Sequence, residues 1–392
     1  MAIDVARARA DTPGCERVLH FNNAGAALMP NQVVEATIAH LRLEAETGGY
    51  EAADTASERL EATYDSIATL INCARGEIAV VENATRAWDM AFYSIPLRSG
   101  DRIVTAMAEY ASNFIAYLQL AQRLGVEIVP IPNDSSGQLD VQALADHIDD
   151  RTRLIAVTHV PTNGGLVNPA SAIGRVARET GVLYLLDACQ SVGQMPIDVA
   201  EIGCDMLSAT GRKFLRGPRG TGFLYVRGSV CEQLEPAFLD LHAATWTGTN
   251  EFQVRPDARR FETWETNVAG KLGLGRAIEY ALDWGLEPVW RRIQTLGAAL
   301  RSGLGDLRGI TITDQGSVRC GIVTFTVASV SSLELQHRLA QRGINVSVSP
   351  REYTRLDMDA RDLPDVVRAS VHYYNTEDEV QRFIEAVDTL AR

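Results

Sequence analysis

Several features that define large protein classes are scarce in this sequence or missing from it. Only six of the 392 residues are cysteine, and no two of them form a CxxC pair, so we expect no disulfide framework and predict a reducing, cytoplasmic location. The seven histidines show no HExxH or similar spacing, and we expect no metal site. No apolar run approaches the roughly 20 residues of a membrane span, and the first residues lack the apolar core of a signal peptide.

Positive charge is also in short supply. The 37 lysines and arginines stand against 50 acidic residues, which gives a formal net charge of −13. Nucleic acids and anionic membranes bind proteins through basic surfaces, so the sequence predicts neither partner. The remaining composition is ordinary: a hydrophobic content of 46% and a charged content of 22% fit a folded globular protein and exclude general disorder.

Apolar runs and helical patterns alternate from about residue 75. Strands are expected at 102–107, 127–132, 153–160, 183–188 and 220–227, with helices at 113–125, 141–148 and 170–180. Such a strand–helix–strand rhythm implies crossover connections, so we predict an α/β fold with a mostly parallel sheet. Before this region, Pro30 marks the start of a helix that carries Val34, Ile38 and Leu41 on one face.

The pattern changes after about residue 285. Strands are expected at 309–314, 321–327, 344–349 and 366–373, with helices at 331–342 and from Thr376 onward. Thr376 and Glu379 fit a capping box at the start of that last helix. We therefore predict an N-terminal arm over 1–20 that packs with the small domain, a large domain over 21–285 and a smaller α+β domain over 286–392. A ligand cleft is expected between the two domains.

The densest group of candidate functional residues lies between 183 and 226. Asp187 ends an apolar strand, at the edge where open α/β sheets bind ligands. Lys213 follows a small, polar segment that runs from Ser208 to Arg212. Taken singly, Asp187 fits a helix-capping residue at a strand end equally well, and Lys213 fits an exposed lysine in a glycine-rich loop. A nicotinamide dehydrogenase is disfavoured, because no GxGxxG follows an early strand.

Taken in order, these segments resemble a known family. LLDACQS (185–191), ATGRK (209–213) and GPRGTG (217–222) are similar to the motifs of the class V aminotransferases. That family includes cysteine desulfurases, selenocysteine lyases, kynureninases and isopenicillin-N epimerase-like proteins. The resemblance covers nearly the whole chain and implies the fold-type I architecture of enzymes that depend on pyridoxal 5′-phosphate (PLP).

The resemblance assigns roles around the cofactor ring. Lys213 is the position that forms a Schiff base with the PLP aldehyde and moves the substrate Cα proton. Asp187 matches the carboxylate that keeps the pyridine nitrogen protonated, and Gln190 matches a hydrogen-bond donor to the ring's phenolic oxygen. Tyr110, where cysteine desulfurases have histidine, matches the residue that covers the ring and offers a hydroxyl for acid–base chemistry. Thr162, with Asn163 as the second choice, matches a further contact to the ring oxygen.

The resemblance also implies residues for the phosphate and the substrate. Asn83, Ala84 and Thr85 match a small-residue turn that opens a helix and receives the phosphate, although Asn83 or Thr85 can equally be a plain N-cap. Thr210 and Arg212 match positions that reach the phosphate from the lysine side; many relatives have histidine at the second. Arg368 in VVRASVHYYNT matches the arginine that pairs with the substrate carboxylate. Substrate recognition is further expected from Asn23 in the FNNAGA turn, Gly49 and Tyr50, Trp246 and the 345–356 loop.

Two departures from the family pattern bear on the reaction. Cysteine desulfurases carry a persulfide-forming cysteine on the loop before the arginine, and 344–367 contains no cysteine. Relatives also present a Gly-Thr turn that reaches the phosphate across a dimer interface. This chain reads RRFETWETN at 259–267, so Thr266 is the predicted replacement, with Trp264 and Glu265 left open. The resemblance implies a homodimer with shared active sites.

The sequence therefore predicts a PLP-dependent enzyme that acts on an amino acid. The leading prediction is a C–S lyase, which eliminates the sulfur substituent of an S-substituted cysteine without a persulfide. Transamination, epimerisation and decarboxylation of an amino acid remain open, because they begin from the same cofactor chemistry. A PLP-fold subunit without catalysis is the alternative from another class, and retention of Lys213, Asp187 and Arg368 speaks against it.

Overall fold

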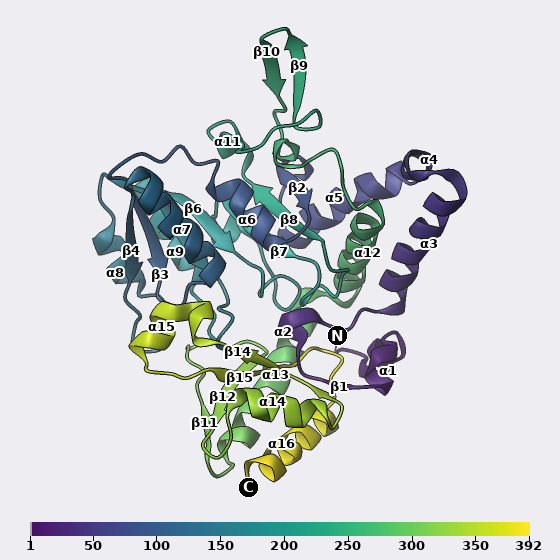
Figure 1. Ribbon diagram of the computed structural model, residues 1–392, viewed down its shortest axis with the longest axis vertical. Helices are drawn as coiled ribbons and strands as arrows, with labels where there is room; N and C mark the ends of the chain where they lie inside the picture. Colours follow the sequence, from purple (N-terminus) through teal and green to yellow (C-terminus); the bar gives the residue numbers. More distant parts are fainter. Residues whose placement is uncertain (1) are drawn as a thin grey trace.

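A computed structural model of the chain describes residues 2–392. Its centre is a seven-stranded sheet with the strand order β2-β8-β7-β6-β5-β3-β4 (Figure 1). The strands are β2 Ile78–Val81, β3 Arg102–Ala106, β4 Glu127–Ile131, β5 Thr152–Thr158, β6 Leu183–Asp187, β7 Met206–Thr210 and β8 Gly222–Val226. Only β8 runs antiparallel to its neighbours in this sheet, and the other neighbouring pairs are parallel. The predicted α/β fold with a mostly parallel sheet is confirmed.

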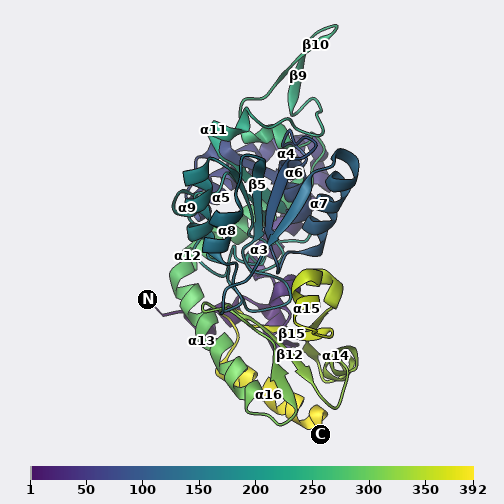
Figure 2. The same cartoon turned by 90° about the vertical axis from the view of Figure 1, so that its left-hand side faces the viewer.

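Helices cover both faces of this sheet, as Figure 2 shows for α7 and α9 on opposite sides of β5. The central strands β5 and β6 are apolar without alternation because both of their faces are buried. The helices around the sheet are α5 Ser57–Ile71, α6 Ala84–Phe92, α7 Ala111–Leu124, α8 Val141–His147, α9 Ala170–Thr180, α10 Val199–Ile202, α11 Gly228–Cys231 and α12 Val268–Trp284. Gly125 ends α7 in the left-handed conformation, with φ of 75°.

A second, antiparallel sheet of four strands lies beside the first, with the order β11-β12-β15-β14. Its strands are β11 Ile310–Ile312, β12 Ile322–Val327, β14 Ser347–Ser349 and β15 Val366–Ser370. It packs with α13 Leu286–Gly305, α14 Ser332–Ala340 and α16 Glu377–Ala391, while α15 Arg355–Ala360 lies toward the first sheet (Figure 1). The predicted capping box is confirmed: the Thr376 hydroxyl accepts from Glu379 N at 3.1 Å, and the Glu379 carboxylate accepts from Thr376 N at 3.2 Å.

The expected strand at 344–349 is divided. Its first part, β13 Ile344–Asn345, leaves the four-stranded sheet and pairs in parallel with β1 Leu19–His20. Nearby, Arg9 of α1 Val5–Ala10 lies 2.8 Å from Glu379, and Phe21 stacks on Phe383 at 4.5 Å between ring centroids. The start of the chain therefore packs against the C-terminal part. We keep 1–20, 21–285 and 286–392 as proposed domain limits.

Three helices follow the N-terminal segment: α2 Asn23–Ala26, α3 Asn31–Thr47 and α4 Gly49–Thr55. Pro30 precedes α3, as expected. The face of α3 with Val34, Ile38 and Leu41 is not the one buried within the chain, because the buried side chains are Val33 and His40, and Leu41 is 52% exposed. An apolar stripe on α3 is thus left on the surface.

A hairpin of β9 Ala244–Gly248 and β10 Glu251–Val254 projects from the top of the molecule (Figure 1). No strand is predicted from the sequence here, although apolar and polar residues alternate through 244–247 and 251–254. Neither face of the hairpin is buried. Trp246 is 80% exposed and Phe252 is 62% exposed. Within residues 2–392, no helix is long and apolar enough to span a membrane, and no group of metal-ligating side chains gathers.

Candidate active site

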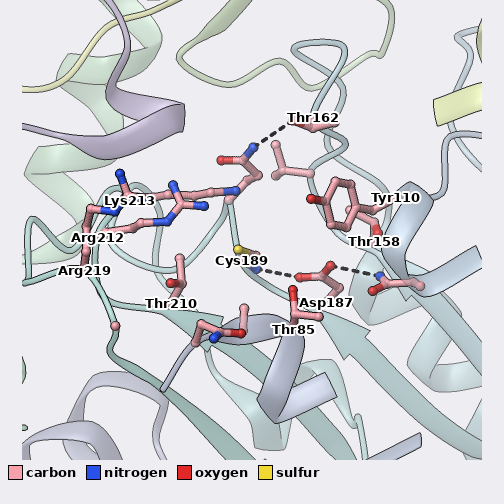
Figure 3. Close-up of a pocket in the computed structure, with 16 residues that line it drawn as sticks. Thr85, Tyr110, Thr158, Thr162, Asp187, Cys189, Thr210, Arg212, Lys213 and Arg219 are labelled. Atoms are coloured by element: carbon pink, nitrogen blue, oxygen red, sulfur yellow. Dashed lines mark hydrogen bonds between the residues drawn. The ribbon is translucent and has the colours of Figure 1, made fainter. Parts of the chain in front are cut away.

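A cavity of about 480 Å³ opens at the carboxyl ends of β5, β6 and β7 (Figure 3). Its lining includes most of the residues that the sequence singled out: Asn83, Ala84, Thr85, Tyr110, Thr162, Asp187, Gln190, Thr210, Arg212 and Lys213. These residues come from five separate segments of the chain. They meet because parallel strands bring their carboxyl ends, and the loops that follow, to one edge of the sheet.

Asp187 is the last residue of β6, and its carboxylate is held from two sides. Oδ2 accepts from Asn113 Nδ2 at 3.0 Å, and Oδ1 accepts from the backbone N–H of Cys189 at 2.9 Å. Burial raises the pKa of this carboxyl group, and the two hydrogen bonds act in the opposite direction. A fixed, buried carboxylate of this kind suits a cationic N–H partner.

Lys213 enters the cavity from the loop after β7, opposite Asp187. When the side-chain oxygen of Gln190 faces Lys213, it accepts from Lys213 Nζ at 3.2 Å. This orientation gives the amine an acceptor. Burial lowers the pKa of Lys213, so the amine is closer to its neutral, nucleophilic form. Gly211 shapes this loop, because a Cβ there would lie 2.2 Å from the Thr221 hydroxyl.

Another part of the cavity wall is formed by the start of α6 and by Arg219 and Gly220 of the GPRG turn. Asn83 caps α6 by accepting from Arg86 N at 2.9 Å, and the first N–H groups of a helix have no acceptor within the helix. Strand β8 approaches this helix closely: a Cβ on Gly222 would lie 2.8 Å from the backbone of Asn83. We propose an anion site here, lined by the helix N-terminus, Thr210 and Arg219.

Tyr110 and Thr162 border the cavity on its remaining side. Tyr110 is the residue before α7, and its ring lies beside Thr158 in Figure 3. Behind Thr162, Arg368 donates to the Thr162 hydroxyl at 2.6 Å, and its Nε has no acceptor among residues 2–392. Burial lowers the pKa of Arg368 to about 10. A buried guanidinium with a free N–H fits an anionic ligand.

Some predicted residues do not line the cavity, among them Arg368 and Asn163, which lie just behind its wall. The side chain of Asn23 is fully buried, donates to Ser370 O at 2.7 Å and accepts from the Tyr374 hydroxyl. Thr266 lies in a separate depression with Glu82 and Arg86. Tyr50 and Trp246 are on the surface, 73% and 80% exposed. Their roles in substrate or partner contact stay predictions.

Sequence reasoning missed other residues of the lining. Asn113, Thr158, Val160, Cys189, Arg219 and Gly220 all face the cavity. Asn113 lies three residues after Tyr110 at the start of a helix, so helical spacing could have placed it on the same side. Arg219 gives no such signal, because an arginine in a glycine-rich turn is usually a surface residue.

Comparison with known proteins agrees with this geometry. The Aminotransferase class-V family matches residues 19–383. The chain belongs to this family. A cysteine desulfurase of Yersinia pestis is 30% identical over 408 residues, covering 100% of this chain and 99% of the relative. An apo cysteine desulfurase from Thermococcus onnurineus NA1 has a TM-score of 0.93 and 26% identity, covering 100% of this chain and 98% of that one.

A further solved structure, of C-DES with glycine covalently linked to its PLP cofactor, is 23% identical with a TM-score of 0.88. It covers 97% of this chain and 98% of that one and shares the fold. The predicted family, the fold-type I architecture and the PLP cofactor are therefore confirmed, and this class V aminotransferase-family chain is a PLP-dependent enzyme.

The residues of the cavity fit this cofactor. The volume of the cavity lies within the range of small-ligand sites, roughly 300–1,000 Å³. Arg212, Lys213 and Arg219 give the cavity an excess of positive charge in a chain whose net charge is −13. A carboxylate for the ring nitrogen, an amine for the aldehyde and a helix N-terminus for the phosphate are all present. We propose these roles for Asp187, Lys213 and the Asn83–Thr85 turn.

Proposed function

We propose that the enzyme cleaves the C–S bond of an S-substituted cysteine and releases the sulfur product directly, without a protein persulfide. One observation carries this proposal. The loop that docks beside the cavity contributes Ser349, whose hydroxyl lies 3.4 Å from Thr162 O, and Pro350, whose carbonyl accepts from Asn163 at 3.0 Å. Neither this loop nor the rest of 344–367 carries a thiol.

The roles of the chain's own residues follow from their positions. Arg368, behind Thr162, binds the substrate carboxylate through its free Nε and so orients the amino acid in the cavity. When bound, PLP supplies an electron sink for the pair left at Cα. Lys213 takes the Cα proton, because its amine lies in the cavity lining and burial lowers its pKa, and Asp187 holds a proton on the ring nitrogen.

The elimination then balances without an oxidant or a protein nucleophile. The Cα–H electron pair forms the Cα–Cβ double bond, the Cβ–S bond breaks, and its electron pair leaves with sulfur. The Tyr110 hydroxyl lies in the cavity lining and is our candidate for protonating the leaving sulfur. Hydrolysis of the released unsaturated amine gives pyruvate and ammonia.

A second candidate is cysteine desulfurase activity, the activity in the names of the relatives above. Cys189 is the one cysteine in the cavity lining among residues 2–392 and is the only local candidate for a sulfur acceptor. Burial raises the pKa of the Cys189 thiol, so it is a poor source of the reactive thiolate. This favours direct release over transfer to Cys189.

Product analysis separates the candidates. The enzyme is incubated with cysteine and with a panel of S-alkyl cysteines and their sulfoxides, and pyruvate, ammonia, thiol product, keto acid and carbon dioxide are followed. We expect pyruvate and ammonia in equal amounts and no persulfide on the protein.

Cys189→Ala is expected to keep most of the turnover. Cys320→Ala is the control for loss of a buried thiol that does not line the cavity. Keto acid without pyruvate, a racemised substrate or carbon dioxide would instead assign transamination, epimerisation or decarboxylation.

We also propose a homodimer in which Thr266 reaches the partner's cofactor. Large apolar side chains are exposed around the hairpin and the preceding loop, among them Phe238, Leu241, Trp246, Phe252 and Trp264. An exposed apolar group of this kind marks an interaction surface. Sedimentation should give a dimer at assay concentrations, whereas an active monomer would contradict the proposal. The six free cysteines support a cytoplasmic location.

A further inference from the structure

A second buried carboxylate, Glu109, lies directly behind Asp187. It follows β3, is 3% exposed and does not line the cavity. Its Oε1 accepts from Tyr110 N at 2.8 Å, from Asn113 Nδ2 at 3.0 Å and from the Thr158 hydroxyl. Its Oε2 accepts from the Thr105 hydroxyl at 3.0 Å and from Thr158 N at 3.1 Å. All of these partners are donors, so both side-chain oxygens of residue 109 must accept hydrogen bonds, as a carboxylate does.

Asn113 connects the two carboxylates. Its Nδ2 lies 3.0 Å from Glu109 Oε1 and 3.0 Å from Asp187 Oδ2. A side-chain amide nitrogen has two hydrogens in fixed directions, so the bond to Glu109 determines where the second hydrogen points. That second hydrogen holds Asp187. Without Glu109 the amide could turn its oxygen toward Asp187, where two acceptors would face each other.

Glu109 also fixes other residues of the cavity. It holds the backbone N–H of Tyr110 and both donors of Thr158. Burial raises the pKa of Glu109 to about 7, and the hydrogen bonds of Thr158 and Asn113 oppose this. The other titratable groups that face the carboxylate pair are Tyr117 on α7, Cys189 and Lys213. Within residues 2–392, the Asn113 side chain alone joins Glu109 to Asp187 by hydrogen bonds.

We propose that Glu109 is a positioning residue: it acts through Asn113 to hold the Asp187 carboxylate toward the ring nitrogen of the cofactor. The inference rests on the role proposed for Asp187, but not on which amino acid is the substrate or which bond is cleaved. Glutamine at position 109 keeps one acceptor oxygen but replaces the other with an NH₂ group that faces donors, and it removes the negative charge. This change should loosen the hold on Asn113 and Asp187 and lower the proton affinity of the ring nitrogen, because the pyridinium loses an ordered, charged partner.

The test follows the ring nitrogen itself. The holoenzyme is prepared with PLP labelled with ¹⁵N in the ring, and the ¹⁵N chemical shift is titrated with pH. Glu109→Gln is expected to lower the midpoint by roughly one pH unit. Asp205→Asn is the matched control, because Asp205 is a largely buried carboxylate that accepts a backbone N–H from Tyr184 at 2.8 Å at the amino end of β6; it should leave the midpoint unchanged.

The pathway through Asn113 has its own test. Glu109→Gln made in an Asn113→Ala background should leave the midpoint where Asn113→Ala alone places it, because the coupling runs through that amide. Equal shifts in both backgrounds would overturn the inference, and so would an unmoved midpoint in Glu109→Gln. If Glu109→Gln does not fold, Asn113→Ala must still move the midpoint, and a midpoint equal to wild type would overturn the inference.

Asp187→Asn separates this inference from the proposed function. If Asp187→Asn leaves the midpoint unchanged, the role of Asp187 is wrong and the inference falls with it. If Asp187→Asn moves the midpoint and Glu109→Gln does not, Asp187 keeps its role and only the role of Glu109 is rejected. Neither outcome depends on measured turnover.

Discussion

At the carboxyl edge of the seven-stranded sheet, Asp187 and Glu109 are buried and each of their oxygens accepts a hydrogen bond from the chain. At the β9–β10 hairpin, by contrast, Trp246 and Phe252 are 80% and 62% exposed. The hydrogen bonds that hold these two carboxylates all come from one chain. The second region, the hairpin, leaves apolar surface uncovered, and covering it would release free energy. The two carboxylates and the exposed apolar side chains of the hairpin therefore lie in separate parts of the molecule, and substitutions of the carboxylates should affect chemistry without affecting assembly.

The largest effect is expected in the first region, from Lys213→Ala. Loss of the amine should reduce turnover by about 10³-fold or more, because it removes both the cofactor attachment and the base. Borohydride reduction of the wild type followed by peptide mapping should label Lys213. The chain has only one other lysine, Lys271, which is partly buried beside the Tyr64 hydroxyl. Label at Lys271 would reject the assignment.

Asp187→Asn is expected to have the next largest effect. The amide keeps the shape but cannot hold a proton on the ring nitrogen, so kcat should fall about 10²-fold or more while KM changes little. Asp205→Asn serves again as the control and should retain normal kcat. Near-normal turnover in Asp187→Asn would show that the buried carboxylate is structural.

Substitutions in the hairpin should instead weaken the association of two chains. Trp246→Ser combined with Phe252→Ser is expected to raise the dimer dissociation constant by at least about tenfold, since aromatic side chains dominate interface energies. The unfolding temperature of the isolated chain should hardly change, because these side chains are exposed in it. Leu333→Ser on α14, where Leu333 is 56% exposed, is the matched control. Unchanged association in the double variant would separate the hairpin from assembly.

The smallest effect is expected where neither region is touched. Thr376→Ala removes the hydroxyl that caps α16 and should lower the free energy of unfolding by about 1 kcal/mol. Turnover and dimerisation should stay normal. Thr389→Ala in the same helix, where the hydroxyl bonds only to Glu385 O, should cost less. A change in kcat in Thr376→Ala would mean that α16 is coupled to the cavity.

Much of the fold could be predicted from the sequence. The strands β3, β4, β5 and β6 and helix α9 lie within a residue or two of their predicted limits, because fully buried parallel strands are short apolar runs with helices between them. Strand β7 was not predicted as an element, although its residues Met206–Thr210 lead into the lysine motif. The hairpin was missed although its apolar and polar residues alternate. Helix α3 was predicted, but its face with Val34, Ile38 and Leu41 is not the face buried within the chain.

The candidate site divides in the same way. Lys213, Asp187 and Gln190 could be found because they lie in short motifs whose order along the chain is distinctive. Glu109 and Asn113 could not be found as a pair with Asp187, because 74 residues separate Asn113 from Asp187. No local motif indicates that the Asn113 amide will bridge the Glu109 and Asp187 carboxylates.

The sequence by itself therefore determined the family, the cofactor and most strands of the large sheet. These follow from local motifs and from the apolar periodicity of each segment. Only the tertiary structure decided how Asp187 is held, which arginines surround the cavity and which apolar side chains stay uncovered. The physical reason is that hydrogen-bond direction and burial depend on which segments are neighbours in space, and a chain fixes those neighbours only when all of its elements pack together.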